Sequence, residues 1–578
     1  MHPERLLLSR HATGGPEHGW ASGADPQRRL AGKWGTVYAL ACAVNVVVLL
    51  FSPTSATAAQ PTAPTVGEVM YRAGFLPSGQ PLRGNRQGGV AVEGSDAACV
   101  KCHRRSGLGT SEGRIIIPPI TARYLFRPNG KAPEDMDYRF GLDAAAKHEP
   151  YTDATLARAI QEGVGRDGRQ LDYLMPRYGL DRPAAAALIT YLKGLSSATS
   201  PGVDADTLHI ATIITPDADR VQRKGMLDVL ERFIADKNAA ILAAERRARA
   251  SPEAGYRITR RWQLHVWELS GEPDTWERQL HERVNAQPVF AVLSGLGGRT
   301  WAPVHRFCET ESIPCLFPNT ELPVSAESDF YALYFSKGVL LEAQLLARRL
   351  HDSRGPVQRK RLVQIFRHED IGEDAAKALR VEARSLALDA VERPLTTNAT
   401  ATELGEALDD VRAGDVLMLW LRPADLARLA PERAPGAEVF FSGIMGGLEN
   451  SPLPAAWRQN SKMTYPFDLP DLRKVRMNFP LGWLKAKDVA VVAERVQTDT
   501  FLACVILADI VAEMLDTLVR DYLVERIEAM LGRRTVNGYY PRLGLGPGQR
   551  FASKGGYIVH FAEPDGPRLF ADGDWLVP

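Results

Sequence analysis

β-Rich runs alternate with helical patterns from residue 208 onward, and this alternation most limits how the chain can fold. Runs such as "LHIATIIT" (208–215), "VFAVLSG" (289–295) and "RLVQIFR" (361–367) are each followed by a stretch with helical spacing. Strands that alternate with helices at these intervals predict βαβ units and parallel sheets. Two such series follow each other in residues 207–578, which predicts a two-lobed α/β domain.

The chain has 578 residues, more than one domain usually holds. The small, polar stretch "SSATSPGVDAD" (196–206) carries Pro and Gly and predicts a linker. It separates a predicted domain at 60–195 from the two-lobed domain at 207–578. The formal net charge is only +1, which argues against nucleic acid as a partner.

The N-terminal residues 1–59 are typical of an export signal with an extension in front of it. Arg28, Arg29 and Lys33 precede an apolar run at 37–51, and the small residues at 56–58 suit a cleavage site. An apolar run of this length is typical of a signal peptide, whereas a spanning helix needs roughly 20 residues. We therefore predict a periplasmic protein, with an uncleaved membrane anchor as the alternative.

The stretch "CVKCH" (99–103) places two cysteines three apart and a histidine directly after them. A zinc site would need a second ligand pair, and the sequence has no second C-x-x-C. A thioredoxin-like pair would sit at a strand-to-helix junction, whereas glycine-rich loops flank this one. C-x-x-C-H is the attachment signature of c-type haem. The sequence thus predicts one covalent haem c on Cys99 and Cys102, with His103 as the proximal iron ligand.

Met175, in "YLMPRY" (173–178), is the predicted distal ligand of the haem iron. Proline follows it, and an amphipathic stretch at 181–195 is predicted to form a helix that closes the pocket. A lone methionine is more often core filler, and this alternative stays open. Met136 and His148 are weaker candidates for the same position.

At these residues the sequence resembles the class I cytochromes c, over roughly residues 66–195. The resemblance rests on "CVKCH", the "PPI" of 118–120, "YLMPRY" and the terminal "LITYLKGL" (188–195). It implies an all-α domain in which the carbonyl of Pro118 accepts a hydrogen bond from the proximal histidine. The chain departs from the family by an insert at 129–150 and by a long glycine-rich lead-in.

The second half resembles the type I periplasmic binding proteins, a class that includes branched-chain amino acid receptors. The likeness rests on the order of elements and on "VFAVLSGLGGRTWAPV", "IPCLFP", "RHEDIGEDAAKAL" and "YPRLGLGPGQRF". It implies a ligand in a cleft between the lobes, held by loops at strand ends. The residues that it assigns to the ligand are Ser294, Gly295, Gly297, Thr300, Trp301, Asn319 and Thr320, with Glu321 facing the same cleft.

The loop 294–301 suits a carboxylate because its glycines let backbone N–H groups approach and the next helix dipole favours an anion. Trp301 would cover an apolar part of the ligand. The alternative is that Ser294–Gly298 is only a tight strand-to-helix turn. The first strand lacks the Gly/Ser-rich loop that such receptors would carry, so the cleft holds either another ligand or none.

Other polar and thiol residues have weaker interpretations. His368, Glu369 and Asp370 are consecutive, so they point in different directions and are better read as surface charge than as a metal cluster. Cys308 and Cys315 would form a disulfide in an oxidising compartment if their side chains face each other. Cys504 lies in an apolar helix as a small buried residue.

These observations predict an exported single-electron carrier fused to a module that binds a small molecule or docks a redox partner, such as a periplasmic dehydrogenase or another cytochrome. A six-coordinate iron has no open site, so no catalysis is required. The alternative is a solute-binding receptor that delivers its ligand to the permease of an ABC-type transporter, with the haem as a redox modulator. A haem peroxidase is a third hypothesis and would need a five-coordinate iron.

Overall fold

The computed structural model describes residues 64–112, 115–127, 149–250, 260–324, 329–352, 361–386, 388–433 and 436–578. Residues 60–578 form one compact unit. The predicted export signal at 1–59 lies outside the described residues, as do Met136 and His148, so their roles stay predictions. No helix of the described residues is long and apolar enough to cross a membrane.

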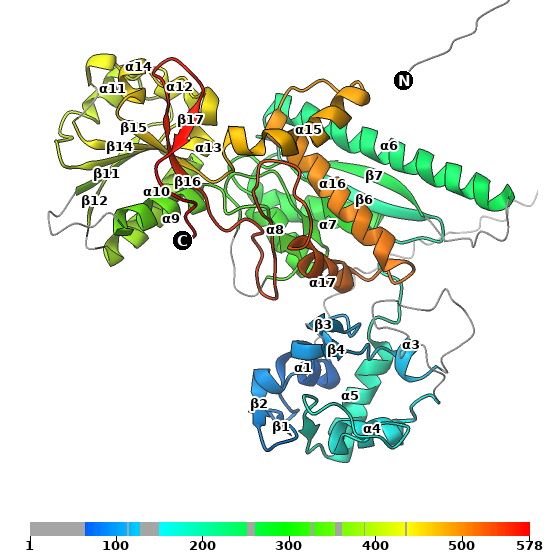
Figure 1. The fold of residues 1–578 in the computed structure, drawn as a ribbon. Coiled ribbons are helices and arrows are strands. Elements are labelled where there is room, and N and C mark those ends of the chain that lie inside the picture. The colour runs from blue at the N-terminus through cyan, green and yellow to red at the C-terminus, as the bar shows by residue number, and fades with distance from the viewer. Residues whose placement is uncertain are drawn as a thin grey trace, which may run out of the picture. The chain divides into compact units, whose positions relative to one another are not determined.

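Helices build the core of the N-terminal domain (Figure 1). They are α1 (Val66–Ala73), α2 (Val100–His103), α3 (Ala122–Leu125), α4 (Asp153–Glu162) and α5 (Arg182–Gly194). Helix α1 packs on α5 at Gly67, where a Cβ atom would lie 2.3 Å from the carbonyl oxygen of Ala187. A glycine is therefore needed for this close crossing. Met70 and Leu188 are buried beside the contact.

The N-terminal domain is not all-α, which corrects the prediction from the sequence. The glycine-rich lead-in forms β1 (Arg83–Asn85) and β2 (Ala91–Glu93), and β1 also pairs with β5 (Arg177–Tyr178). A second hairpin joins β3 (Thr110–Glu112) and β4 (Ile115–Ile117). These strands have only two or three residues, too few for a period-2 pattern to be recognised in the sequence.

The first lobe is a five-stranded parallel sheet in the order β10-β9-β8-β6-β7. Its strands are β6 (Thr207–Ile214), β7 (Arg261–Glu268), β8 (Ala291–Leu293), β9 (Cys315–Leu316) and β10 (Ala332–Leu333). Helices α6 (Arg220–Ala250), α7 (Trp276–Ala286) and α8 (Ala302–Thr310) connect them. Strand β8 is buried on both faces, which is why its sequence is continuously apolar.

The second lobe is a seven-stranded sheet in the order β12-β11-β13-β14-β15-β16-β17. Five strands are parallel: β11 (Arg361–Arg367), β12 (Asp389–Leu395), β13 (Val416–Trp420), β14 (Glu438–Ser442) and β15 (Ser461–Tyr465). Two antiparallel strands, β16 (Tyr557–Phe561) and β17 (Leu569–Ala571), complete the edge. Its helices are α9 (Val339–Asp352), α10 (Ile371–Ser385), α11 (Ala401–Glu406), α12 (Pro423–Leu426), α13 (Gly443–Gly446) and α14 (Ala455–Arg458). The prediction of two α/β lobes with parallel sheets is confirmed.

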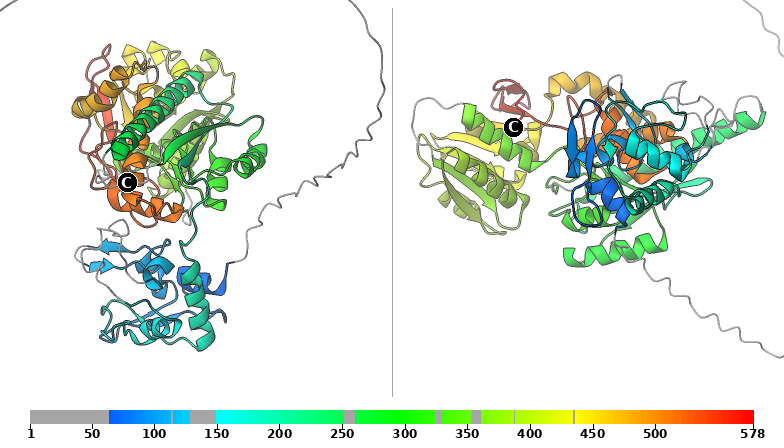
Figure 2. Two further views of the ribbon diagram at one scale, coloured as in Figure 1. Left: turned by 90° about the vertical axis from the view of Figure 1, so that its right-hand side faces the viewer. Right: turned by 90° about the horizontal axis from the view of Figure 1, so that it is seen from below.

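Three C-terminal helices return from the second lobe to the first. They are α15 (Pro470–Ala486), α16 (Glu494–Met514) and α17 (Arg520–Leu531). Helix α16 packs against α6 (Figures 1 and 2). The chain therefore passes between the lobes three times, at about residues 334–338, 466–470 and 550–556, and we call these the crossing segments.

Candidate functional site

His103 ends the short helix α2 and is buried, with 7% of its surface exposed. Its Nδ1 atom lies 3.0 Å from the carbonyl oxygen of Pro118, so the ring can donate there and keep Nε2 for another bond. Burial lowers the pKa of His103 to about 4, although the Pro118 carbonyl acts in the opposite direction. The imidazole is therefore neutral at ordinary pH, as an iron ligand must be.

A glycine allows the Pro118 segment to approach the histidine. Gly109 has a φ of +70°, and a Cβ atom there would lie 2.1 Å from the carbonyl oxygen of Ile117. Its N–H donates to the carbonyl of His103 at 3.3 Å. Any side chain at 109 would push β4 away from α2, so this glycine fixes the distance between the imidazole and Pro118.

Cys99 and Cys102 lie one helical turn apart, and neither takes part in a disulfide. Both are half-buried, and Cys99 packs against the apolar core of the N-terminal domain. Burial raises the pKa of the Cys99 thiol to about 12. Two thiols next to a neutral imidazole are the groups that form the two thioethers and the proximal bond of haem c.

Met175 packs against the same apolar core as Cys99, although 76 positions separate them in sequence. The half-buried side chain is carried by a turn in which the N–H of Met175 donates to the carbonyl of Asp172 at 3.1 Å. Arg177 fixes the turn by donating to the carbonyls of Met175 and Leu171. The domain thus offers an imidazole, two thiols and a thioether around one core, and this donor set fits a c-type haem.

In the first lobe, Ser294 and Asn319 come together as the sequence predicted, but the polar group that they meet belongs to the protein itself. Ser294 Oγ lies 2.8 Å from Oγ1 of Thr500 on α16, and Asn319 donates to Ser294 Oγ at 3.0 Å. All three side chains are buried. In this conformation Thr500 occupies the position at which a ligand would meet them.

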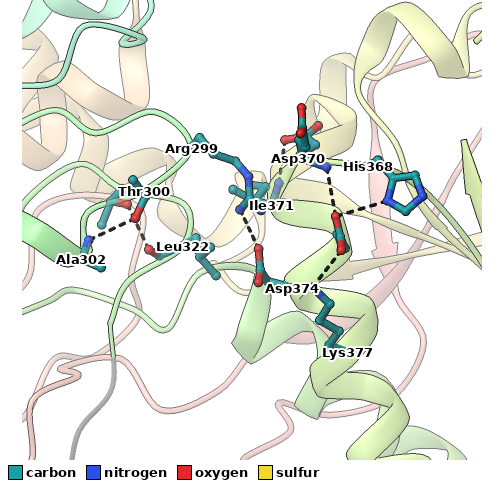
Figure 3. Close-up of polar contacts among 12 residues, drawn as sticks. Arg299, Thr300, Ala302, Leu322, His368, Asp370, Ile371, Asp374 and Lys377 are labelled. Atoms are coloured by element: carbon teal, nitrogen blue, oxygen red, sulfur yellow. Dashed lines mark hydrogen bonds and ion pairs between the residues drawn. The ribbon is translucent and has the colours of Figure 1, made fainter. Parts of the chain in front are cut away.

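Trp301 packs on the glycine loop and is fully buried in the first lobe. A Cβ atom at Gly295 would lie 2.4 Å from the indole ring, and one at Gly297 would lie 2.8 Å from it. The two glycines therefore make room for the tryptophan, and the indole has no exposed face with which to cover a ligand. Thr300 accepts a hydrogen bond from the N–H of Ala302 at 3.2 Å, at the start of α8 (Figure 3).

Two arginines join the lobes at the strand ends. Arg299, in the loop that precedes α8, pairs with Asp374 on α10 at 2.6 Å (Figure 3). Arg422, after β13, pairs with Asp370 of its own lobe and with Glu321 of the first lobe, both at 2.8 Å. Neither arginine could be named from the sequence, because the partners lie 52 to 101 positions away and no local pattern connects them.

A small cavity of about 20 Å³ remains between the lobes, lined by Asn319, Thr320, Glu321, Arg495 and Asp499 among others. This volume is large enough for about one water molecule, whereas the cavity of a ligand-binding site usually measures about 300–1,000 Å³. Burial raises the pKa of Asp499 to about 7, and the neighbouring Arg495 acts against the shift. The lobes would therefore have to separate before the cleft could take up an amino acid or a larger solute.

His368 and Glu369 are exposed, and Asp370 is half-buried at the start of α10. His368 Nδ1 lies 3.6 Å from Glu373, which also pairs with Lys377 at 2.8 Å (Figure 3). These ion pairs make the segment part of a charged surface.

Among the described residues, His305, Glu309 and Asp329 bring their ligand atoms within 4.8 Å of one another. The Glu309 carboxylate already accepts three backbone N–H groups, from residues 330–332, at 2.7–2.9 Å. His305 lies 3.0 Å from Asp329 and 2.8 Å from the Tyr334 hydroxyl. These internal bonds join α8 to the segment at 329–334 and account for the proximity of the three side chains.

Cys308 and Cys315 are buried thiols that interact with each other and form no disulfide in this structure. Burial, followed by the hydrogen bond from Cys315, raises the pKa of Cys308. Cys504 is fully buried on α16, as the apolar pattern predicted.

Comparison with known proteins finds solved structures of low sequence identity. No protein-family model and no curated protein matches the chain. A fatty acid ABC transporter substrate-binding protein from Thermomonospora curvata is 15% identical with a TM-score of 0.46, over 66% of this chain and 95% of its own. A possible leucine/isoleucine/valine-binding protein from Rhodopirellula baltica SH 1 is 15% identical with a TM-score of 0.44, and the match covers 65% of this chain and 98% of that protein. A branched-chain amino acid ABC transporter from Thermus thermophilus with bound valine is 12% identical with a TM-score of 0.44, and the match covers 64% of this chain and 97% of that protein.

Proposed function

We propose that the protein is an exported c-type cytochrome that carries single electrons on one covalent haem and is fused to a two-lobed binding module. The observation that carries this proposal is the 3.0 Å contact between His103 Nδ1 and the Pro118 carbonyl. This contact fixes the ring and leaves Nε2 for an iron atom, next to two thiols at the spacing of haem attachment. Cys99, Cys102, His103 and Met175 would hold the haem, which supplies reversible one-electron chemistry when bound.

Purification of the mature protein from a host that attaches haem c tests this proposal. The pigment should stay with the polypeptide after denaturation in acid and extraction with organic solvent, since thioether bonds survive both treatments. One haem per chain and a reversible reduction are expected. A colourless protein, or colour that moves into the solvent, would reject the proposal.

Replacement of Met175 by leucine tests the distal ligand. The variant should lose the sulfur-to-iron absorption band and have a lower reduction potential, because a thioether ligand raises the potential. Covalent haem content should stay unchanged, since both thioethers remain. Met70, which is fully buried in the same core, is the matched control, and Met70→Leu should keep the band. An unaltered band in Met175→Leu would remove Met175 from the site.

A second candidate function is that of a solute-binding receptor for an ABC-type transporter, with the haem as a redox modulator. It is favoured by the two parallel-sheet lobes, by the three crossing segments between them and by the polar residues at the facing strand ends. The similar structures named above are described as binding proteins for fatty acids and for branched-chain amino acids. A permease and a periplasmic location would follow from this function.

A thermal-shift screen of the full chain with amino acids and fatty acids tests the second candidate. A true ligand at about 100 times its Kd stabilises the protein by about 2.7 kcal/mol, which raises Tm by a few degrees. Thr320→Val, which removes a hydroxyl at the cavity, should reduce the shift, whereas Thr310→Val at an exposed site should not. A panel that leaves Tm unchanged would favour a docking role for the module.

A further inference from the structure

Three charged side chains connect the haem-attachment loop to the two-lobed module. Arg104 directly follows His103, Glu528 lies on α17, and Arg550 lies on the third crossing segment. Each arginine pairs with its own oxygen of the Glu528 carboxylate, Arg104 with Oε2 and Arg550 with Oε1. The side chains of Glu528 and Arg550 are 3% and 4% exposed, so water hardly screens the pairs. We call these three residues the arginine–glutamate triad.

Arg104 has a backbone conformation that residues other than glycine rarely adopt, with φ 66° and ψ 172°. Such a conformation persists only where the surroundings impose it, and it occurs preferentially at functional sites. Within the N-terminal domain, the Arg104 N–H donates to the Val100 carbonyl at 3.0 Å, and the Tyr71 hydroxyl donates to the Arg104 carbonyl at 2.7 Å. From the module, the Glu528 ion pair holds the guanidinium. The module therefore helps to fix the residue that follows the proximal histidine.

The next two residues of the loop are also bound to the module. The N–H and hydroxyl of Ser106 donate to Glu525 at 3.0 and 2.5 Å. The Arg105 guanidinium lies 4.2 Å from the centre of the Phe330 ring. The loop thus contacts the module through three consecutive side chains.

At the other end of the triad, Arg550 belongs to the connection between the lobes. Its carbonyl accepts the N–H of Tyr334 at 2.9 Å, so it pairs the first crossing segment with the third. Its Nη1 atom donates to the Phe330 carbonyl at 2.6 Å. Because domain closure is absorbed by a few residues in such connections, Arg550 would move when the cleft opens.

We propose that Glu528 is a positioning residue that couples the haem-attachment loop to the crossing segments, so that the state of the haem and the opening of the cleft influence each other. The inference rests on the proposed haem function. A carboxylate shared by two arginines cannot keep both contacts in their best geometry if either arginine moves. Coupling of this kind is reciprocal: a change at the loop alters the crossing segments, and opening of the lobes alters the loop.

Hydrogen exchange of the full haem-loaded chain, fully oxidised or reduced by an added one-electron reductant, tests the coupling. Peptides that cover 550–556 should exchange at rates that differ by about threefold or more between the two states. Glu528→Gln should abolish the difference while retaining the haem. Glu513→Gln removes a glutamate that is 40% exposed on α16 and pairs with Arg526, and it should retain the difference. Equal differences in the wild type and Glu528→Gln would overturn the inference.

Arg104→Gly is a second variant, because glycine adopts the observed backbone angles without strain and the Tyr71 contact to the carbonyl can persist. It should also abolish the oxidation-dependent difference at 550–556, and a retained difference would overturn the coupling. If the wild type carries no covalent haem, the proposed function fails. The contact between the loop and the third crossing segment is then tested by hydrogen exchange of the haem-free chain, in which Arg104→Gly should accelerate exchange at 550–556. Unchanged exchange there would overturn the link as well.

Discussion

A double replacement of Cys99 and Cys102 by alanine is expected to yield a protein from which acid and organic solvent extract all of the haem. Both porphyrin attachments are lost, while His103 and its contact to Pro118 remain. Without attachment the haem is held only by axial ligands and apolar packing, so acid releases it when His103 becomes protonated. Extraction followed by absorption spectroscopy of both phases measures the outcome.

Cys504→Ala is the matched control for this experiment, since it removes a buried thiol from α16, outside the N-terminal domain. This control should keep its colour with the polypeptide. Retention of the pigment by the double variant would mean that the haem is attached elsewhere. The single variants should each keep one thioether and therefore remain coloured after extraction.

The second large effect concerns the pH dependence of stability through Glu342. This fully buried residue of α9 accepts hydrogen bonds from the Ser442 hydroxyl and from the N–H of Ile444 at 3.1 Å. Burial raises the pKa of Glu342 from 4.5 to about 8, against the hydrogen bonds, which lower it. The folded state therefore keeps a protonated carboxyl over a range in which the unfolded chain ionises. The stability from this group is complete below about pH 4.5 and is lost as the pH rises to about 8.

The loss is at most about 5 kcal/mol, since each pH unit between the two pKa values contributes about 1.36 kcal/mol. Glu342→Gln should remove most of this slope, because the amide does not ionise. Denaturant titrations at about pH 5, 6.5 and 8 measure the free energy of unfolding. Asp499 and Glu525, whose pKa values burial raises to about 7, add slopes of the same sign in both proteins.

Glu406→Gln, at an exposed position of α11, is the control and should leave the slope unchanged. Parallel slopes for the wild type and Glu342→Gln would show that Glu342 is ionised in the folded state. The hydrogen bonds to Glu342 would then have to stabilise the charged carboxylate against the cost of burial.

The proposed haem site rests on a local pattern, so its residues could be named from the sequence. Five consecutive residues carry both thiols and the imidazole, and their spacing along one helical turn is fixed by backbone geometry alone. The alternation of strands and helices predicted both lobes for a similar reason, since parallel neighbours need helical crossovers. The short strands β1 to β5 were not predicted from the sequence. Whether two or three residues form a strand depends on the strand they pair with and not on their own residue pattern.

The cleft was only partly predictable. Ser294 and Asn319 were expected at one strand-end edge, and the parallel sheet does bring them together. The residue that satisfies them, Thr500, lies 206 positions after Ser294 and belongs to a helix that returns from the other lobe. The glycines of the loop 294–301 would be needed whether the loop binds a ligand or packs against Trp301. In both cases another group lies so close to the backbone that a side chain would not fit, so the sequence alone could not separate the two.

By itself, the sequence determined the α/β class of each lobe and the position of the C-x-x-C-H motif before the module, because helical periodicity and motif spacing depend on neighbours a few residues apart. Only the tertiary structure decided which distant charges meet. Arg299 pairs with Asp374, and Arg104 shares Glu528 with Arg550 across as many as 424 positions. The physical reason is that an ion pair is set by distance in space and by exclusion of water, and neither quantity is encoded in the local order of residues.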